Sequence, residues 1–308
     1  MDPPAHQSDP TADEKEAREP GAAARSTPRH SLWRFFAGTF ALRWSADLWL
    51  LLAYTGVLPV NTVARLALTG IAGASPSVTA FWLTWRESGP AGVRDLLGRA
   101  MRRRFAWKWY ALSVLLPLAA VYGGVWAYAF LSGWPPERWV LPALPAALAA
   151  AVAPPLGEEF GWRGYALPRL QARSGALPAS LVIGAAWSVW HLPLFLMPGG
   201  GEFHVPFIVF LVETGIGWSV LMTWLYNRSG GALLTSLLFH GAGNFALTMA
   251  PLYVGTLHAY ELYTAGLLLL VSLLAAFGHL TTPVRTVLRR RVRLGQPPEP
   301  VPGAAPPG

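Results

Sequence analysis

Long apolar segments separated by short polar stretches run through most of the chain. Segments of about 17 to 25 residues recur, the length that an α-helix needs to cross the hydrocarbon core of a bilayer. We place them at residues 44–60, 66–85, 109–131, 139–157 (to 167 if that helix continues), 179–197, 206–226, 232–251 and 260–280. Asp47 and Pro59 interrupt the first segment, and Gly70, Gly73 and Pro76 interrupt the second. The pattern predicts an all-α polytopic membrane protein of about eight transmembrane helices.

The two ends of the chain differ from this pattern. Residues 1–30 are polar, rich in proline and of mixed charge, which predicts a disordered cytoplasmic tail rather than a signal peptide. Residues 31–284 form the predicted membrane domain, with its core motifs within 139–251. Residues 285–308 begin with an arginine-rich segment and end in a Pro/Gly-rich tail. The arginine run is either a solvated helix end or an anchor to anionic lipid headgroups.

Composition and charge placement support a membrane protein. Hydrophobic residues make up 53% of the chain and charged residues only 13%, whereas soluble domains carry about 25% charged residues. The net charge is +8, and the basic residues gather in alternate loops. By the positive-inside rule, both termini are predicted to be cytoplasmic. The expected partner of this charge is the surface of the cell membrane rather than nucleic acid, and the absence of cysteine excludes a thiol nucleophile.

A charged cluster lies inside the fourth apolar segment. An ionisable residue in a membrane span is costly and is therefore a functional hypothesis by default. Glu159 and Arg163 are four residues apart and can pair along one helix face, whereas Glu158 points about 100° away and has no partner on its own helix. Glu158 is thus available as a general base or acid. Pro154 and Pro155 remove backbone donors just upstream, and we expect them to bend the helix and admit water.

Histidine and asparagine residues lie in two later segments. His191 is in the fifth, and His240 and Asn244 share one face of the seventh. If the fourth helix continues past its two glutamates, Glu158 and both histidines meet at a similar depth; if it ends before them, the convergence weakens. Each residue has a simpler interpretation: a histidine that bonds between helices, a glutamate at a helix end, Arg163 as a charge anchor, or Asn244 in packing. The joint pattern favours an active site inside the helix bundle.

The other polar residues near the predicted spans have weaker claims. Glu213, in the sixth segment, either lines a cavity or pairs locally. Asp47, His204, His258 and His279 lie near predicted span ends, and we expect them to be interfacial.

Three motifs follow one another on successive core helices. They are EExxxR at 158–163, an aromatic residue separated by three positions from a histidine at 187–191, and HxxxN at 240–244. Together they resemble the CPBP family of intramembrane proteases, named for CAAX proteases and bacteriocin-processing enzymes and also called Abi. The resemblance covers about residues 66–250, and tryptophan stands at 187 where the family more often has phenylalanine.

The resemblance implies a role for each motif residue. Glu158 would be the base that activates a water molecule against a peptide carbonyl group, and His191 would help to hold that water. His240 and Asn244 would stabilise the oxyanion, a task suited to preorganised donors in a dry site. The ion pair of the first motif would organise the site.

A metal ion is a second interpretation of the same residues. The family is commonly labelled metalloprotease, and Glu158, His191 and His240 could be three zinc ligands around an open position. The chain has no HExxH motif, and a base that uses Glu and His without a metal is equally consistent. Both mechanisms stay open at this point, and we favour the metal-independent one.

The predicted activity is that of an intramembrane endopeptidase that hydrolyses a peptide bond of a membrane-associated or prenylated CAAX-type protein or peptide. No GxGD motif of aspartyl intramembrane proteases and no convincing GxSG motif of rhomboid-type serine proteases is present. One alternative is a non-catalytic membrane protein, such as an immunity factor that binds a peptide toxin. Another is a proton or ion transporter, which the absence of an internal repeat makes less favoured.

Overall fold

The computed structural model of the chain describes residues 29–101, 106–133, 144–197, 205–250 and 258–276. Every regular element within these ranges is a helix, and these ranges contain no strand. The elements are α2 (Arg29–Tyr54), α3 (Thr62–Ala100), α4 (Trp107–Ser132), α5 (Leu144–Glu159), η2 (Phe160–Ala166), α6 (Leu167–Ser174), α7 (Ala176–Trp190), α8 (Leu192–Phe195), α9 (Phe207–Val212), η3 (Glu213–Trp218), α10 (Ser219–Arg228), α11 (Leu233–Met249) and α12 (His258–Ala276). The chain is thus an all-α polytopic membrane protein, as predicted.

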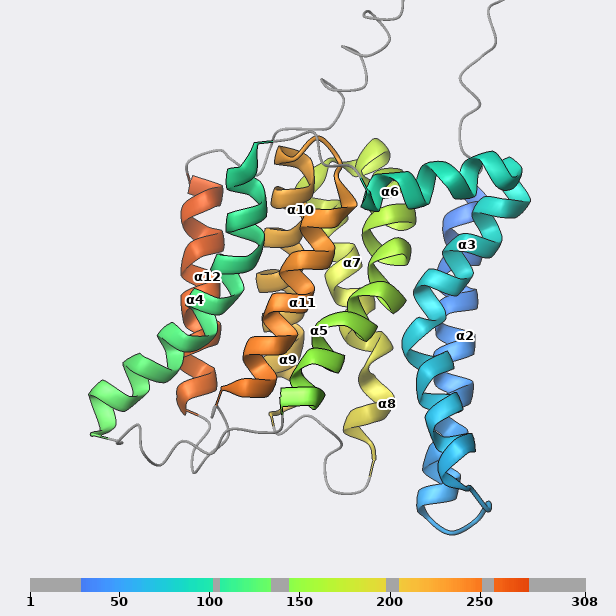
Figure 1. Ribbon diagram of the computed structural model, residues 1–308, viewed down its shortest axis with the longest axis horizontal. Coiled ribbons are helices and arrows are strands. Elements are labelled where there is room, and N and C mark those ends of the chain that lie inside the picture. The colour runs from blue at the N-terminus through green and yellow to red at the C-terminus, as the bar shows by residue number, and fades with distance from the viewer. Residues whose placement is uncertain (1–28, 102–105, 134–143, 198–204, 251–257, 277–308) are drawn as a thin grey trace, which may run out of the picture.

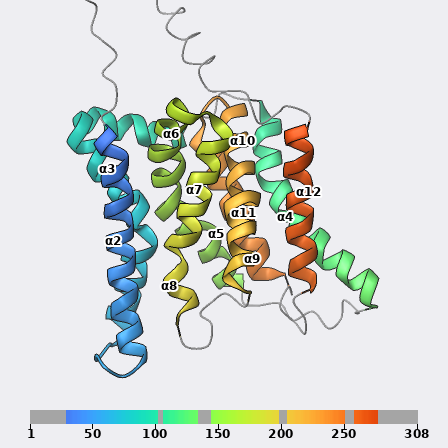
Figure 2. The ribbon, with the colours of Figure 1, turned by 180° about the vertical axis from the view of Figure 1, so that it is seen from behind.

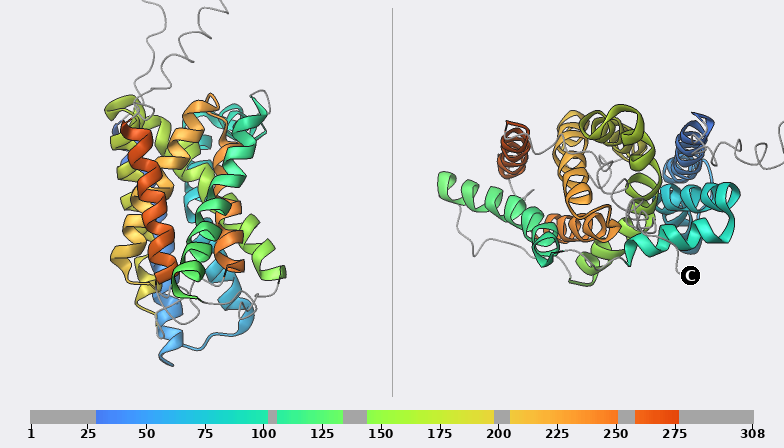
Figure 3. Two further views of the ribbon diagram at one scale, coloured as in Figure 1. Left: turned by 90° about the vertical axis from the view of Figure 1, so that its left-hand side faces the viewer. Right: turned by 90° about the horizontal axis from the view of Figure 1, so that it is seen from above.

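The helices form a bundle with the predicted core helices in its middle. α2 and α3 pack together at one side, and α4 and α12 pack together at the other (Figure 1). α5, α7, α10 and α11 lie between these two pairs, as the view from behind also shows (Figure 2). Seen from above, α2 and α12 are at opposite sides of the bundle (Figure 3). The motif-bearing helices are therefore covered on both sides.

Within the part of the chain that the structure describes, three helices are long and apolar enough to cross a membrane, namely Thr62–Ala100, Trp107–Ser132 and Phe207–Arg228. Shorter apolar helices are Ala176–Trp190, Leu233–Met249 and Ala259–Ala275. The basic residues of α3 after Gly89, of α6 and of the end of α10 lie at one end of the bundle (Figure 1). This placement agrees with the charge pattern from which the orientation is predicted. Eight crossings and cytoplasmic termini stay predictions.

The first predicted span is displaced in the structure. Residues 44–60 were expected to be apolar and helical, but α2 begins at Arg29 and ends at Tyr54. The cause is an ion pair: Arg43 Nε and Asp47 Oδ2 are 2.5 Å apart, one helical turn from each other and buried. Because each charge has its partner within the helix, the helix can pass through both. Of the predicted tail, residues 1–30, residues 1–28 lie outside the described residues, and residues 29 and 30 are helical as the start of α2.

α3 is longer than the predicted second span and contains a sharp bend. The helix begins after Asn61, whose side-chain Oδ1 accepts a hydrogen bond from the Ala64 backbone N–H at 2.8 Å. Gly89 has φ 59 and ψ −160, and Pro90 begins the next helical segment. The segment after Gly89 lies across one end of the bundle, toward α6 (Figure 1). The bend separates the spanning part of α3 from a surface helix.

The fourth predicted helix continues past its two glutamates. α5 passes through Glu158 and Glu159 into η2 and then into α6, which ends at Ser174. The prediction that the helix runs on to residue 167 is therefore confirmed. η2 is a seven-residue stretch of i→i+5 hydrogen bonding, and all seven of its residues are buried. Such π-helical turns are often found at functional sites.

Glycines allow the core helices to approach closely. A Cβ atom added to Gly184 on α7 would lie 2.1 Å from the carbonyl oxygen of Gly215 on η3. Backbone cannot yield as a flexible side chain does, so α7 and η3 would have to separate. Small residues at such contacts are typical of membrane helices, where close packing drives association.

We therefore expect Gly184→Ala to lower the stability of the protein by about 1–3 kcal/mol, the usual cost of overpacking a core. The measurement is the unfolding midpoint in detergent. Gly70→Ala is the matched control, because nothing lies within 4 Å of a Cβ added there and alanine favours a helix. Equal midpoints for the two variants would contradict the contact between α7 and η3.

Candidate active site

The two glutamates of the first motif end α5 and are both buried. Glu158 is 4% exposed and Glu159 0% exposed. Glu159 Oε1 accepts hydrogen bonds from Arg163 Nη1 at 3.0 Å and from His240 Nδ1 at 2.8 Å. The predicted pair of Glu159 and Arg163 is thus present. Its link to His240 was not predicted, because the spacing along the sequence says nothing about which helix faces α5.

Arg163 completes this buried cluster. Its Cζ lies 4.5 Å from the ring centroid of Trp187, a cation–π contact between η2 and α7. Arg163 Nε and Nη2 and Glu159 Oε2 are buried and have no hydrogen-bond partner among the described residues. Buried charge of this kind is costly, and a bound substrate or water can supply the missing partners.

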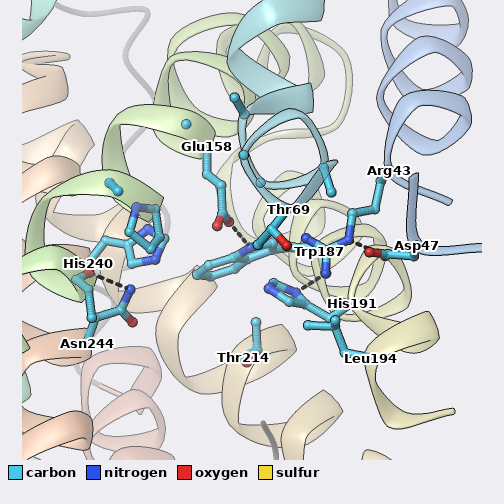
Figure 4. A pocket seen from close by; sticks show the side chains of 18 of the residues that line it. Arg43, Asp47, Thr69, Glu158, Trp187, His191, Leu194, Thr214, His240 and Asn244 are labelled. Atoms are coloured by element: carbon cyan, nitrogen blue, oxygen red, sulfur yellow. Dashed lines mark hydrogen bonds and ion pairs between the residues drawn. The ribbon is translucent and has the colours of Figure 1, made fainter. Parts of the chain in front are cut away.

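Glu158 receives its hydrogen bond from a different helix. Trp187 Nε1 on α7 donates to Glu158 Oε2 at 2.5 Å (Figure 4). Tryptophan at this motif position supplies an indole N–H, which phenylalanine lacks. The prediction that Glu158 has no partner on its own helix agrees with this contact, and its carboxylate lines a cavity.

His191 directly follows α7 and faces the same cavity as Glu158. Its Nδ1 lies 2.9 Å from the Trp187 carbonyl oxygen, so the neutral ring carries its proton on Nδ1. The ring packs edge-on against Trp190 and Phe210, with centroids 4.6 and 5.2 Å apart. These contacts fix the orientation of the imidazole relative to Glu158 (Figure 4).

Asn244 has a structural contact in addition to its place in the cavity. Its Nδ2 donates to the Ala150 carbonyl oxygen at 3.2 Å. That carbonyl would normally accept from the backbone of residue 154, which is a proline and has no N–H. Similarly, a Cβ at Gly241 would lie 2.4 Å from the carbonyl oxygen of Ala151, the acceptor left by Pro155. α11 therefore covers the carbonyl groups that the two prolines expose.

The cavity that joins these residues has a volume of about 1510 Å³, more than the roughly 300–1,000 Å³ of a small-molecule pocket. It extends from the motif residues to the inner faces of α2 and α3, and its lining is mainly apolar. Glu158, His191, His240 and Asn244 all line it (Figure 4). An extended, largely apolar substrate would fit this shape.

Two further acidic residues, Glu213 and Asp47, line the cavity. Their surroundings were predicted less accurately from the sequence than those of the motif residues. Glu213 accepts hydrogen bonds from the hydroxyl groups of Tyr260 and Tyr263, so it both lines the cavity and pairs locally. Asp47 was expected to be interfacial, which is wrong: it is 1% exposed, pairs with Arg43 and lines the cavity. The spacing of Asp47 four residues after Arg43 is the sequence signal that could have predicted this ion pair.

Three histidines were also predicted to be interfacial, and the structure does not describe their side chains. His204 and His279 lie outside the described residues, and His258 begins α12 without a described side chain.

The zinc hypothesis requires three ligands close together. The described part of the chain contains no group of three His, Asp or Glu side chains that could hold a metal ion. His240 directs Nδ1 to Glu159 and His191 directs Nδ1 to a backbone carbonyl group. The described residues thus do not bring Glu158, His191 and His240 together as a three-ligand group, and no metal enters the mechanism proposed below.

Comparison with known proteins shows similarity over the part of the chain that holds these residues. Residues 139–246 match the model of the type II CAAX prenyl endopeptidase Rce1-like family. The chain is also similar to a protein of Methanococcus maripaludis described as CAAX prenyl protease 2, with 29% identity over 139 residues, or 42% of this chain. The matched region spans about half (48%) of that relative's length. Residues 139–246, which hold all the motif residues described above, are thus similar to the Rce1-like family, in agreement with the resemblance that the motifs carry.

Proposed function

We propose that the protein is an intramembrane endopeptidase that hydrolyses a peptide bond near the C-terminus of a prenylated, CAAX-type protein or peptide. The observation that carries the proposal is the placement of Glu158, His191 and His240 around one cavity lined mainly by apolar groups. A general base beside a hydrophobic cavity suits hydrolysis of a substrate that carries a lipid chain. The similarity of residues 139–246 to the type II CAAX prenyl endopeptidase Rce1-like family supports the same substrate class.

Glu158 and His191 act on the water molecule. In the proposed mechanism a water lies between the Glu158 carboxylate and the His191 ring. Glu158 takes one proton as the hydroxide oxygen forms a bond to the peptide carbonyl carbon. The same carboxyl group then gives that proton to the departing amine as the C–N bond breaks. Trp187 holds the carboxylate in place through its indole N–H.

His240 stabilises the tetrahedral intermediate. Its Nδ1–H donates to Glu159, which leaves Nε2 as the atom directed away from that carboxylate. With a proton on each nitrogen, a ring held in this way would present Nε2–H to the oxyanion, much as an aspartate orients the histidine of a serine protease triad. Asn244 lies one helical turn further along α11 and lines the same cavity, which supports a shared role with His240 in stabilising the oxyanion.

The test is a cleavage assay with the purified protein in detergent. The substrates are a farnesylated peptide ending in a C-a-a-X sequence, the same peptide without the lipid, and a farnesylated peptide with a reversed C-terminal sequence. We expect mass spectrometry to detect release of the C-terminal residues from the first peptide only. Two results together would favour a non-catalytic binding protein instead. The native chain would cleave none of the peptides, and Glu158→Gln and His240→Ala would leave the cellular phenotype unchanged.

A chelator series tests the metal-independent mechanism. We expect cleavage to continue in EDTA or 1,10-phenanthroline after dialysis, because the described residues form no three-ligand group. Activity that is lost on chelation and restored by stoichiometric zinc would contradict this mechanism. The control is a zinc endopeptidase assayed in the same detergent, which must lose its activity.

A further inference from the structure

α2 brings an arginine into the cavity from outside the region that matches the family. Arg43 and Asp47 both line the cavity, and α2 also contacts α7 and α8. The two side chains are 6% and 1% exposed, so the charge of Arg43 is not screened by bulk water. A buried arginine beside a substrate cavity is a site for an anionic group.

The guanidinium group is held on two sides. Asp47 Oδ2 accepts from Arg43 Nε at 2.5 Å, and the Trp190 ring centroid lies 4.3 Å from Arg43 Cζ. Figure 4 shows Arg43 reaching from α2 toward His191. Its charge is close enough to interact electrostatically with both Glu158 and His191. Arg43 is therefore fixed in orientation and lies near the reacting groups.

We propose that Arg43 binds the C-terminal carboxylate of the substrate. This inference rests on the proposed function, since a C-a-a-X substrate ends three residues after the lipidated cysteine. Three extended residues span about 10 Å, so a peptide bond placed at Glu158 brings the terminal carboxylate within reach of a neighbouring helix. A carboxylate that enters a mainly apolar cavity needs a charged partner, and a guanidinium group is the donor that matches its geometry.

The other charges of the cavity agree with this assignment. Asp47, Glu158 and Glu213 would repel a carboxylate. Arg65 also lines the cavity, but its side chain is exposed, where water weakens such a pair. Asp47 occupies the Nε edge of Arg43, which turns the remaining guanidinium N–H groups toward other acceptors. Arg43 is thus the cation best placed to select a free C-terminus.

The test measures binding without cleavage. A fluorescent farnesylated C-a-a-X peptide with a free C-terminal carboxylate, and the same peptide as its C-terminal amide, are titrated into the Glu158→Gln protein. We expect the acid to bind about 10- to 100-fold more tightly than the amide, the usual strength of a charge-assisted pair. Arg43→Gln should remove this preference and leave the affinity of the amide unchanged, and Arg43→Lys should keep part of it.

Two sets of controls separate recognition from folding. Arg43→Gln leaves Asp47 buried without its partner, so the double variant Arg43→Gln/Asp47→Asn is measured as well and should show the same lost preference. Arg34→Gln, at an exposed position of the same helix, and Arg65→Gln should keep the preference.

Three results would overturn the proposal: equal or undetectable binding of the two peptides, a preference that survives in both Arg43 variants, or an equal loss of affinity for acid and amide. Cleavage is measured in parallel with native Glu158. Absence of cleavage alongside an acid preference that depends on Arg43 would refute the proposed function and leave the carboxylate site standing.

Discussion

Replacement of Glu158 by glutamine is expected to reduce the rate of peptide cleavage by about 10²- to 10⁴-fold, the typical contribution of a general base. The amide has nearly the same size, and its oxygen can still accept the hydrogen bond from Trp187 Nε1. It cannot take a proton from water. The rate of the chemical step should therefore fall while the affinity for the peptide changes little.

The measurement is single-turnover cleavage of the farnesylated peptide in detergent. Glu213→Gln is the matched control, because Glu213 is also a buried carboxylate that lines the same cavity but is bonded to two tyrosines. We expect that variant to retain activity within a few-fold of the native chain. Comparable losses in the two variants would show that any buried carboxylate of the cavity matters equally, and Glu158 would lose its assignment as the base.

Arg163→Met is expected to have the largest effect on stability, about 3–5 kcal/mol, because it removes the arginine from a fully buried ion pair and leaves the Glu159 carboxylate only its contact with His240. Both members of the pair are 0% exposed. Methionine keeps much of the side-chain volume, so the loss reflects charge rather than a cavity. Activity should fall as well, since Glu159 also holds His240.

Unfolding in detergent, followed by helical circular dichroism, measures the effect. The double variant Glu159→Gln/Arg163→Met should recover part of the lost stability, because it removes the uncompensated charge. Asp95→Asn disrupts the exposed pair of Asp95 and Arg99 with the same i,i+4 spacing, and we expect it to cost about 1 kcal/mol or less. Similar losses for Arg163→Met and Asp95→Asn would refute the buried pair as a stabilising element.

Local spacing predicted the contacts that lie along a single helix. The pairing of Glu159 with Arg163 follows from four positions of separation, and the structure contains it. The convergence of the motif residues on one cavity also agrees with the structure. These features depend on helix geometry, which a sequence carries within a few residues.

Contacts between helices were harder to predict. The bonds from Trp187 to Glu158 and from His240 to Glu159 depend on how α7 and α11 rotate against α5, which apolar periodicity does not define in a helix that is hydrophobic on all sides. The contribution of α2 was missed for another reason. The first predicted span began at residue 44 and left out Arg43, which pairs with Asp47 within the helix.

The π-helical turn of η2 has a consequence for how this chain can change in length. An i→i+5 turn accommodates one residue more than an i→i+4 turn, so a single-residue deletion within 160–166 would convert η2 to a regular α-helix. A single-residue deletion earlier in α5 has no extra residue to absorb it, and α6 would then rotate by about 100° around its axis. Arg169 and Gln171 would turn away from Glu87 and Asn227, their hydrogen-bond partners on α3 and α10. η2 is therefore the part of this continuous helix at which a residue can be lost while Arg169 and Gln171 keep their partners on α3 and α10.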